Sequence, residues 1–312
     1  MRPSTARLQP TRKLPRVGFL GALSPSLYAG QVAALLSGLR ELGYIDGTTI
    51  HLEFRWADGK YDLLPQLAAE YERLQVDVLV THGTPGTLAA KAALKTIPIV
   101  AAAIGDPVTT GVVTSIAHPG GNITGLAHFS PELAVKRLEI LTQAFPLVKR
   151  VAIVFNPDNL LAEPILRAMV PAAASLRVNL YRVPVRGPYA FTDALASLIG
   201  ENVEALVLVD DGMLIANAQE FAGMASAQRL TSIGFTEFAR GGGLLGYGVN
   251  FLVMFSRAAI LIDRILKGAK PGDIPIEQAT KFEMIVNLRT AKALGLDIPP
   301  SLLARADEVI EW

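Results

Sequence analysis

Short apolar runs recur along the first third of the chain, separated by amphipathic segments. The runs VGFLGAL (17–23), VDVLVTHG (76–83) and IPIVAAAI (97–104) are almost continuously apolar, whereas TIHLEFRWA (49–57) alternates apolar and polar residues. Continuous apolar runs of this length are typical of strands that are buried on both faces of a parallel sheet. We therefore expect parallel strands with helices covering both sides.

The segments between these runs carry apolar residues at helical spacing. The first helix is predicted to end at Gly43, and the second is predicted to be capped by Asp62 or a neighbour. The third is predicted to have Thr84 at its N-cap and Pro85 at its first position, where proline is well tolerated.

The same alternation returns between residues 151 and 235. In chain order, the predicted elements are VAIVF (151–155), a helix near 160–177, NLYRVPV (179–185), a helix near 190–200, ALVLV (205–209), a helix near 214–228 and TSIGF (231–235). Two successive series of this kind predict an α/β fold with two Rossmann-like lobes, each built on a parallel sheet.

Three short extended stretches lie between helical segments, as hinge strands that join two lobes would. They are NITGLAHF (122–129), LLGYGVN (244–250) and KFEMIVNL (281–288). Residues 1–15 are predicted to form a flexible arm. The lobes are predicted to comprise residues 16–125 plus 249–280 and residues 126–248 plus 281–312.

Small, hydroxyl and acidic residues follow the predicted strands. In open parallel sheets, ligands bind beyond the carboxyl ends of the strands, and a helix N-terminus at that edge suits a carboxylate. The run 97–104 stops at Gly105-Asp106-Pro107, which we interpret as a turn at the mouth of a cleft. Residues of these types also form ordinary turns, so the interpretation depends on many of them falling on one edge of two sheets.

Composition excludes several classes of function. The 312 residues are 51% hydrophobic and 18% charged, and their net charge of +1 favours neither nucleic acid nor an anionic membrane as a partner. The chain has no cysteine, and no two of its four histidines have the i, i+4 spacing of a helical metal pair. We therefore expect no metal site and no cofactor.

Neither a secretory signal nor a membrane span is expected. The first fifteen residues, MRPSTARLQPTRKLP, are basic and lack the apolar stretch of a secretory signal. The most apolar helical segment, FLVMFSRAAILIDRIL (251–266), is interrupted by Arg257 and Asp263 and is short for a bilayer.

Two long blocks of the sequence resemble a known family. They are GDPVTTGVVTSIAHPGGNITGL (105–126) and ILKGAKPGDIPIEQATKFEMIVNLRTAKALGLDIPPSLLARADEVI (265–310), with RGGGLLGYGVN (240–250) between them. They are similar to ABC-transporter substrate-binding proteins, a family that includes tryptophan- and tyrosine-binding members. The resemblance implies a type I periplasmic-binding-protein fold, in which two lobes joined by three crossing strands close on a small molecule.

The resemblance also implies partners and a location. It implies a non-enzymatic carrier, expected to be a monomer, that hands a small-molecule ligand to an ABC permease in the membrane, driven by a separate ATPase. Periplasmic export is implied in the same way, although this sequence lacks the lipobox cysteine of many members. The ligand is expected to be an amino acid or an aromatic acid.

By position, the resemblance places ligand-contacting loops at the ends of five strands. In members that bind amino acids, hydroxyl and backbone donors hold the carboxylate, and an acidic group holds the amine. Thr84 with the amides of residues 84–86 is the carboxylate candidate, and Asp210 or Asp211 is the amine candidate. Either aspartate could instead cap the helix near 214, and Asp106 could tie down its own turn or close against the second lobe. The full set is Ala22, Leu23, Ser24, Gly83, Thr84, Pro85, Gly105, Asp106, Pro107, Asn156, Asp210 and Asp211.

Aromatic and histidine side chains near the predicted cleft are less specific. Four aromatic residues could stack on a ligand ring, although aromatic residues at such places more often belong to the core. His82 and His128 are each expected to make a local hydrogen bond rather than to contact the ligand. The four aromatic residues are Tyr28, Phe129, Phe235 and Tyr247.

Two other functions fit the sequence less well. It contains no GxxxxGK[ST], GxSxG or HExxH motif, and Asp210 and Asp211 would point to opposite sides of an extended stretch, so catalysis is not expected. The alternative is a ligand-sensing module of a signalling or regulatory system with the same fold. A DNA-binding version would need a helix-turn-helix segment, which the first fifteen residues do not contain.

Overall fold

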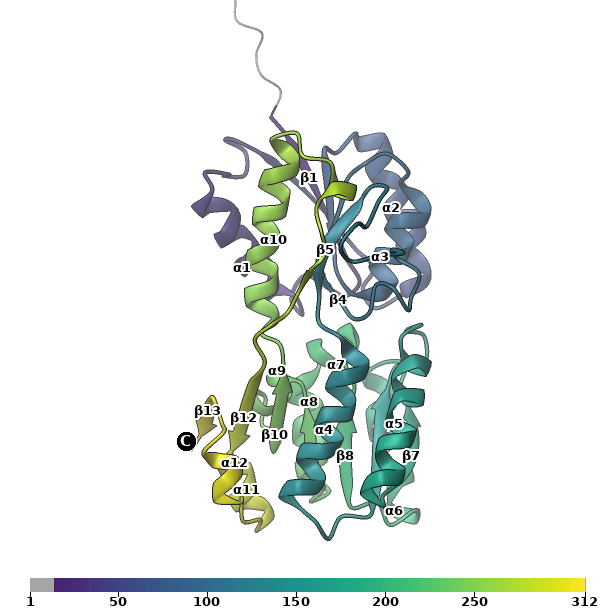
Figure 1. Ribbon diagram of the computed structural model, residues 1–312, viewed down its shortest axis with the longest axis vertical. Helices are drawn as coiled ribbons and strands as arrows, with labels where there is room; N and C mark the ends of the chain where they lie inside the picture. The colour runs from purple at the N-terminus through teal and green to yellow at the C-terminus, as the bar shows by residue number, and fades with distance from the viewer. Residues whose placement is uncertain (1–13, 312) are drawn as a thin grey trace, which may run out of the picture.

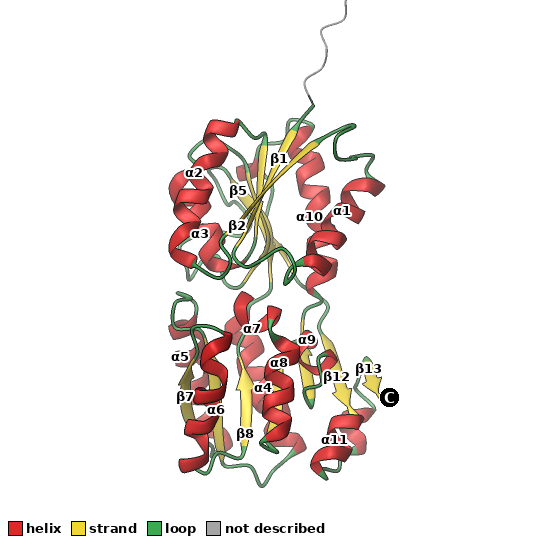
Figure 2. Ribbon diagram, turned by 180° about the vertical axis from the view of Figure 1, so that it is seen from behind, coloured by secondary structure: helices red, strands yellow, loops and turns green. Residues whose placement is uncertain are grey.

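The computed structural model describes residues 14–311, and these form two α/β lobes that lie end to end along the molecule (Figure 1). Each lobe has a central sheet with helices on both faces (Figure 2). The predicted fold class is therefore confirmed. The predicted arm of residues 1–15 lies almost entirely outside the described residues.

The first lobe contains a six-stranded sheet in the order β11-β5-β4-β3-β1-β2, and all its neighbouring strands are parallel. The strand β4 is buried along its whole length, as its sequence IVAAAI predicts. Helices α2 and α3 cover one face of the sheet, and α1 and α10 cover the other (Figure 2). The elements are β1 (Arg16–Gly21), α1 (Ala29–Glu41), β2 (His51–Trp56), η1 (Tyr61–Leu63), α2 (Leu64–Leu74), β3 (Val78–Thr81), α3 (Gly83–Ala93), β4 (Ile99–Ile104), β5 (Ile123–Ala127), α10 (Phe251–Leu266), η3 (Pro271–Asp273) and β11 (Glu277–Gln278).

The helix α10 belongs to the first lobe although more than a hundred residues separate it from β5. Its apolar stripe packs on α1, where Gly38 lets the two backbones approach closely. A Cβ atom at Gly38 would lie 2.5 Å from the carbonyl oxygen of Ser256 on α10. Because that atom belongs to the backbone, it cannot simply rotate away, and a larger residue would push the two helices apart.

The second lobe contains a seven-stranded sheet in the order β13-β12-β10-β9-β8-β6-β7. Its neighbouring strands are parallel except for β10 and β12, which are antiparallel. The elements are α4 (Ser130–Ala144), β6 (Arg150–Phe155), α5 (Ala162–Leu176), β7 (Asn179–Pro184), η2 (Pro188–Ala190), α6 (Phe191–Gly200), β8 (Ala205–Leu208), α7 (Gly212–Ala216), α8 (Ala218–Ala227), β9 (Thr231–Gly234), α9 (Thr236–Arg240), β10 (Leu245–Gly248), β12 (Glu283–Asn287), α11 (Leu288–Leu294), α12 (Pro300–Leu303) and β13 (Glu308–Ile310).

The chain passes between the lobes three times (Figure 1). It crosses after β5 into α4, after β10 into α10, and between β11 and β12. These crossings fall within or beside the three extended stretches predicted to join the lobes. The boundaries assigned to each lobe stay a prediction.

Three predicted helix starts differ from the observed ones. The helix α2 follows Leu63, and Asp62 caps nothing because it lies inside the preceding 3₁₀ turn. The helix α3 follows His82, so Thr84 and Pro85 are its second and third residues. The helix predicted near 214–228 is two helices that meet at Asn217, whose side chain donates a hydrogen bond to the Met213 carbonyl oxygen of α7.

None of the helices within residues 14–311 combines the length and the hydropathy that a bilayer-spanning segment needs.

Candidate functional site

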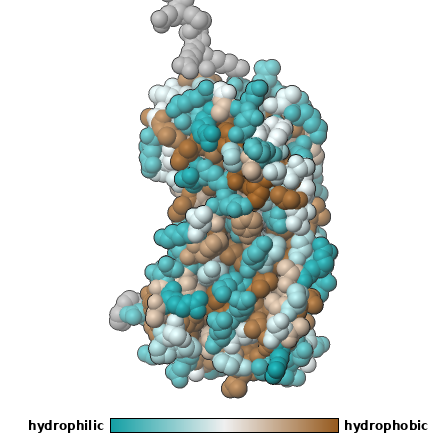
Figure 3. Space-filling view, in the orientation of Figure 1, coloured by the Kyte–Doolittle hydropathy of each residue, from teal (hydrophilic) through white to brown (hydrophobic). Residues whose placement is uncertain are grey.

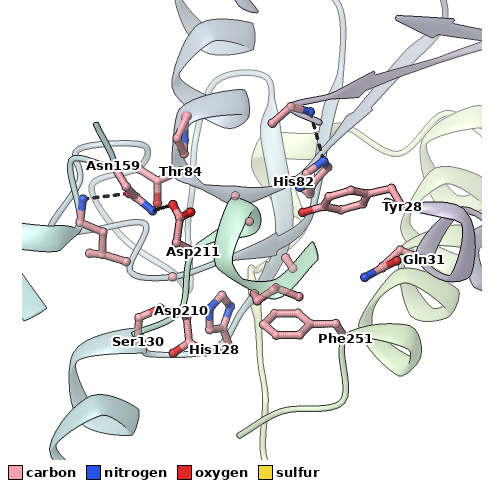
Figure 4. Close-up of a pocket in the computed structure, with 18 of the residues that line it drawn as sticks. Tyr28, Gln31, His82, Thr84, His128, Ser130, Asn159, Asp210, Asp211 and Phe251 are labelled. Carbon is pink, nitrogen blue, oxygen red and sulfur yellow. Dashed lines mark hydrogen bonds between the residues drawn. The ribbon is translucent and has the colours of Figure 1, made fainter. Parts of the chain in front are cut away.

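A cavity lies between the two lobes, at the carboxyl ends of strands from both sheets (Figure 4). The space open to the centre of a water-sized sphere is about 50 Å³, which is several times what one buried water needs. The lining residues come from both lobes and from the crossings. They are Ala22, Tyr28, Gln31, Tyr61, His82, Gly83, Thr84, Pro85, Ala103, Gly105, His128, Ser130, Asn159, Leu161, Asp210, Asp211, Gly212, Ile215, Phe251 and Phe255.

Seven of the twelve residues predicted to contact a ligand line this cavity. They are Ala22, Gly83, Thr84, Pro85, Gly105, Asp210 and Asp211. Of the other five, Leu23 and Pro107 are buried outside the cavity lining, and the hydroxyl of Ser24 pairs with that of Ser26. Asn156 lies behind the wall of the cavity, where its side chain donates to Asp211.

Asp106 holds its own turn and does not line the cavity. Its Oδ1 accepts hydrogen bonds from the backbone N–H groups of Val108 and Thr109, at 3.1 and 3.0 Å. Of the two alternatives that the sequence left open for Asp106, this is the one in which it ties down its own turn. The strand β4 therefore ends in a self-capped turn, and only Gly105 of that turn faces the cavity.

Asp211 is a buried carboxylate on the cavity wall. It caps α7 by accepting from the Met213 and Leu214 amides, and its Oδ2 accepts from Asn159 Nδ2 at 3.0 Å. Burial raises the pKa of the Asp211 carboxyl, while these hydrogen bonds act to lower it. Since Oδ2 accepts a single protein hydrogen bond, it has a lone pair left for a donor in the cavity.

Asp210 differs from Asp211 because its charge is already paired. Its two oxygens accept hydrogen bonds from the Arg137 guanidinium on α4, at 2.8 and 3.0 Å. The Arg137 side chain is fully buried and also donates to the carbonyl oxygens of Leu208 and Tyr247. These contacts connect α4 to the ends of β8 and β10. Because the charge of Asp210 is paired with Arg137, Asp211 is the carboxylate of the cavity that remains available to an ammonium group.

Thr84 faces the cavity from the first turn of α3. The helix has no side-chain cap, and its first N–H groups have no partner within the helix. Pro85 has no N–H, so of the amides of residues 84–86 predicted to hold a carboxylate, only those of Thr84 and Gly86 can donate. The Thr84 hydroxyl makes no hydrogen bond with any described part of the chain, although the residue is only 2% exposed. Because none of the lining residues is a lysine or an arginine, a carboxylate here would depend on neutral donors and the helix N-terminus.

Aromatic side chains form the opposite end of the cavity. The Tyr28 and His82 rings lie 4.1 Å apart, centroid to centroid, and Phe251 and Phe255 reach the cavity from α10. Of the four aromatic residues named from the sequence, only Tyr28 lines the cavity. Phe235 is buried against Phe238, Tyr247 stacks on Phe282, and Phe129 is the N-cap of α4.

Several lining residues carried no usable sequence pattern. Phe251 and Phe255 read as core positions of an apolar helix, and their approach to β3 and α1 depends on long-range packing. Gln31 lies on α1 and is 9% exposed, which amphipathic periodicity does not predict. Asn159 follows Asn156 in a turn, and only the position of Asp211 gives it a role.

His82 gives a pH dependence that can be measured. Burial lowers the pKa of the His82 imidazole from 6.5 to about 3. Below pH 6.5, His82 takes up a proton in the unfolded chain but stays neutral in the folded one. The free energy of unfolding is therefore unaffected by the titration of this residue above about pH 6.5 and decreases as the pH falls below that value. When the pH is lowered from about 7.5 to 5, the free energy of unfolding of the wild type should fall by about 2 kcal/mol more than that of His82→Phe, which has no titratable group at this position. Urea denaturation at the two pH values measures the difference, and identical losses would contradict the prediction.

The lobes touch each other around the cavity. A Cβ atom at Gly105 of the first lobe would lie 2.1 Å from the Leu161 side chain and 2.8 Å from the Ser130 hydroxyl, both in the second lobe. A Cβ atom at Gly212 of the second lobe would lie 3.0 Å from the Tyr28 hydroxyl of the first. We call these five residues the closure seam. The surface of the two lobes is continuous on the face shown in Figure 3.

Comparisons with known proteins agree with this architecture. The family model for ABC transporter substrate binding proteins matches residues 22–310. A tyrosine-binding protein of Clostridioides difficile is 26% identical over 266 residues, which cover 84% of this chain and 75% of that protein.

Solved structures agree as well. A conserved domain protein from Vibrio cholerae is 26% identical, with a TM-score of 0.88 over 95% of this chain and 100% of that one. An ABC domain from Streptococcus pneumoniae in complex with L-Trp is 23% identical, with a TM-score of 0.86 over 96% of this chain and 100% of that one. Since the family model covers nearly all of the described residues, this chain belongs to the family of ABC transporter substrate binding proteins.

Proposed function

We propose that this protein is the extracytoplasmic solute-binding component of an ABC importer and that its lobes close on an aromatic amino acid. The observation that carries the proposal is the division of the cavity into two ends. Thr84, Asn159 and Asp211 form a polar end, and Tyr28, His82 and Phe251 form an aromatic end (Figure 4). Phe255 also lines the cavity from α10, and its ring lies 5.8 Å from that of His82.

The polar end has the charge pattern of a zwitterion site. Asp211 offers a buried carboxylate to an ammonium group, and the uncapped N-terminus of α3 with the Thr84 hydroxyl offers donors to a carboxylate. These groups come from different lobes, so one amino acid would bridge the gap between them. Such a bridge stabilises the closed arrangement over the open one by its differential affinity.

The aromatic end accounts for the side chain of the ligand. The Tyr28 and His82 rings with Phe251 and Phe255 offer aromatic faces and edges against which a ring of the ligand can pack. The names of two relatives support this choice, because one is a tyrosine-binding protein and the other was solved with L-Trp. The closed arrangement has little free volume, so the lobes must open to admit the ligand.

The partners follow from the same proposal. The closed, loaded protein would act as a monomer on the outer side of the membrane, in the periplasm or the equivalent space. There it would deliver the ligand to an ABC permease driven by a separate ATPase. Support comes from the family to which the chain belongs.

A ligand screen tests the function. Thermal-shift measurements with L-tryptophan, L-tyrosine, L-phenylalanine, sugars and short peptides should give the largest shifts with the aromatic amino acids. At 100 times the dissociation constant, a ligand should add about 2.7 kcal/mol to the free energy of unfolding. Shifts with sugars alone would contradict the zwitterion site.

Asp211→Asn tests the ammonium contact. Asparagine still caps a helix, so the α7 cap should survive, but the negative charge is lost. Affinity for L-tryptophan or L-tyrosine by isothermal titration calorimetry should fall by about 10- to 100-fold. The matched control is Asp106→Asn, which makes the same chemical change in a turn cap outside the cavity. Equal affinities for the two variants would refute this role for Asp211.

A further inference from the structure

His128 occupies the first crossing between the lobes, after β5 and two residues before α4 begins. Its side chain lines the cavity, is 5% exposed, and lies between Asp210 and the Phe251 ring (Figure 4). The Phe251 ring packs edge-on against it at 5.2 Å. In the part of the chain that the structure describes, His128 Nδ1 is the one fully buried side-chain nitrogen or oxygen without a hydrogen-bond partner. Such an atom in a native protein calls for a partner that the chain itself does not supply.

The hydrogen bond at the other ring nitrogen, Nε2, indicates which tautomer the His128 imidazole adopts. His128 Nε2 and the Ser130 hydroxyl lie 3.0 Å apart and form a hydrogen bond. If Nε2 carried the proton, the Ser130 hydroxyl proton and the Nδ1 lone pair would both be left unpaired. If Ser130 donates to Nε2, Nδ1 carries the proton and a single donor is left over. The second arrangement satisfies more groups and makes His128 Nδ1 a buried N–H donor on a residue that lines the cavity.

The surroundings of this donor favour an anionic acceptor. The helix α4 begins at Ser130, and its N-cap, Phe129, supplies no side-chain cap. Since Pro131 has no N–H and the Leu133 N–H bonds the Phe129 carbonyl, the Ser130 and Glu132 N–H groups are the donors left at this terminus. The strands β5, β4 and β3 are neighbours, so His128, Gly105 and Thr84 follow adjacent strand ends. Gly105, between the other two, contributes no side chain to this edge. Two helix N-termini without side-chain caps and two unpaired donors therefore line one cavity. Of the two carboxylates in the same lining, Asp210 is already paired with Arg137, and Asp211 is the candidate for the ammonium group.

We infer that His128 is a ligand-binding residue whose Nδ1–H donates to one carboxylate oxygen of the bound amino acid, while Thr84 and the α3 N-terminus hold the other. Ser130 acts as a positioning residue that keeps the imidazole in this tautomer. This assignment rests on the proposed function, because it names a contact within the zwitterion site. It also places one ligand contact directly on a crossing segment, where it can stabilise the closed geometry of the hinge.

The test compares ligands with and without a carboxylate. L-tryptophan and tryptamine share the indole ring and the ammonium group, and only the first has a carboxylate. His128→Phe keeps a ring against Phe251 and removes the donor, so its affinity for L-tryptophan should fall by about 10- to 100-fold. Its affinity for tryptamine should stay within about twofold of the wild-type value. His128→Asn, which restores an N–H donor, should recover much of the loss, and the exposed His51→Phe should change neither affinity.

Nuclear magnetic resonance of the histidine ring tests the positioning role of Ser130. The ¹⁵N chemical shifts of the His128 ring should show protonated Nδ1 in the wild type, and that nitrogen should shift when L-tryptophan binds. In Ser130→Ala, protonated Nε2 should become populated, with a smaller loss of affinity than in His128→Phe.

The results distinguish failure of the His128 contact from failure of the proposed function. Loss of tryptamine and L-tryptophan affinity in equal measure, unchanged affinity in His128→Phe, or protonated Nε2 in the wild type would overturn the assignment and leave the proposed function standing. If the wild type bound neither L-tryptophan nor L-tyrosine, the proposed function would fail, and the carboxylate contact would fail with it.

Discussion

Replacing Arg137 with methionine should lower the free energy of unfolding by about 3–5 kcal/mol, because it leaves a buried carboxylate without its partner. The Arg137 and Asp210 side chains are 0% and 3% exposed, so water cannot take over the lost interactions. The carbonyl oxygens of Leu208 and Tyr247 would also lose a donor. Urea denaturation followed by circular dichroism measures the loss.

Two controls isolate the buried charge as the cause. Arg182→Met removes an arginine from an ion pair whose partners are 55% and 54% exposed, and should cost no more than about 1 kcal/mol. Adding Asp210→Leu to Arg137→Met removes the unpaired charge and should restore part of the stability. An Arg137→Met variant as stable as Arg182→Met, or a double variant no more stable than the single one, would refute the explanation. Asp210→Ala should likewise destabilise the fold, beyond any effect on binding.

Gly105→Val should weaken ligand binding by about 100-fold because it keeps the lobes from closing. A Cβ atom at this position would lie 2.1 Å from Leu161 and 2.8 Å from Ser130, across the closure seam. The Gly105 backbone is outside the left-handed region, so valine is compatible with the local conformation when the lobes are apart. If the clash lowers the equilibrium constant for lobe closure about 100-fold, the apparent affinity falls in the same proportion. Isothermal titration calorimetry with L-tryptophan or L-tyrosine measures the change.

Two controls match this prediction. One makes the same glycine-to-valine change elsewhere, and the other shortens Leu161, the side chain that the new valine would meet. Gly223→Val adds a valine on α8 where a Cβ atom would meet nothing within 4 Å, and should leave affinity unchanged. Leu161→Ala added to Gly105→Val makes room at the seam and should restore part of the affinity. Wild-type affinity in Gly105→Val would mean that the lobes do not need to close at this seam.

The fold could be predicted from the sequence because its elements follow local patterns. The buried run at 97–104 became β4, and the apolar segment at 251–266 became α10 with the same bounds. The strand ends also located the cavity, since most of the predicted loops line it. Local apolar periodicity and turn residues suffice for these features, because each depends on a few neighbouring residues.

The roles within the site depend on distant partners and could not be predicted. Asp106, Asp210 and Asp211 all follow strands, yet one caps its own turn, one is paired with Arg137, and one faces the cavity as a helix cap. Arg137 reads as an ordinary polar position of α4, and nothing near it in the sequence indicates that it is fully buried. His128 was expected to make a local hydrogen bond, and it does so through Nε2, but the free Nδ1 is visible only in three dimensions.

The most direct test of the account is a distance measurement between the two lobes. The chain has no cysteine, so Glu72→Cys on α2 and Val170→Cys on α5 would give a clean pair of spin-label sites. Both residues are exposed, and the helices α2 and α5 that carry them lie on the side of the molecule away from the crossings (Figure 1). Pulsed electron paramagnetic resonance should show a broad, longer distance distribution without ligand that narrows and shortens when L-tryptophan or L-tyrosine is added. A distribution that stays the same with saturating ligand would contradict closure of the lobes as the basis of binding.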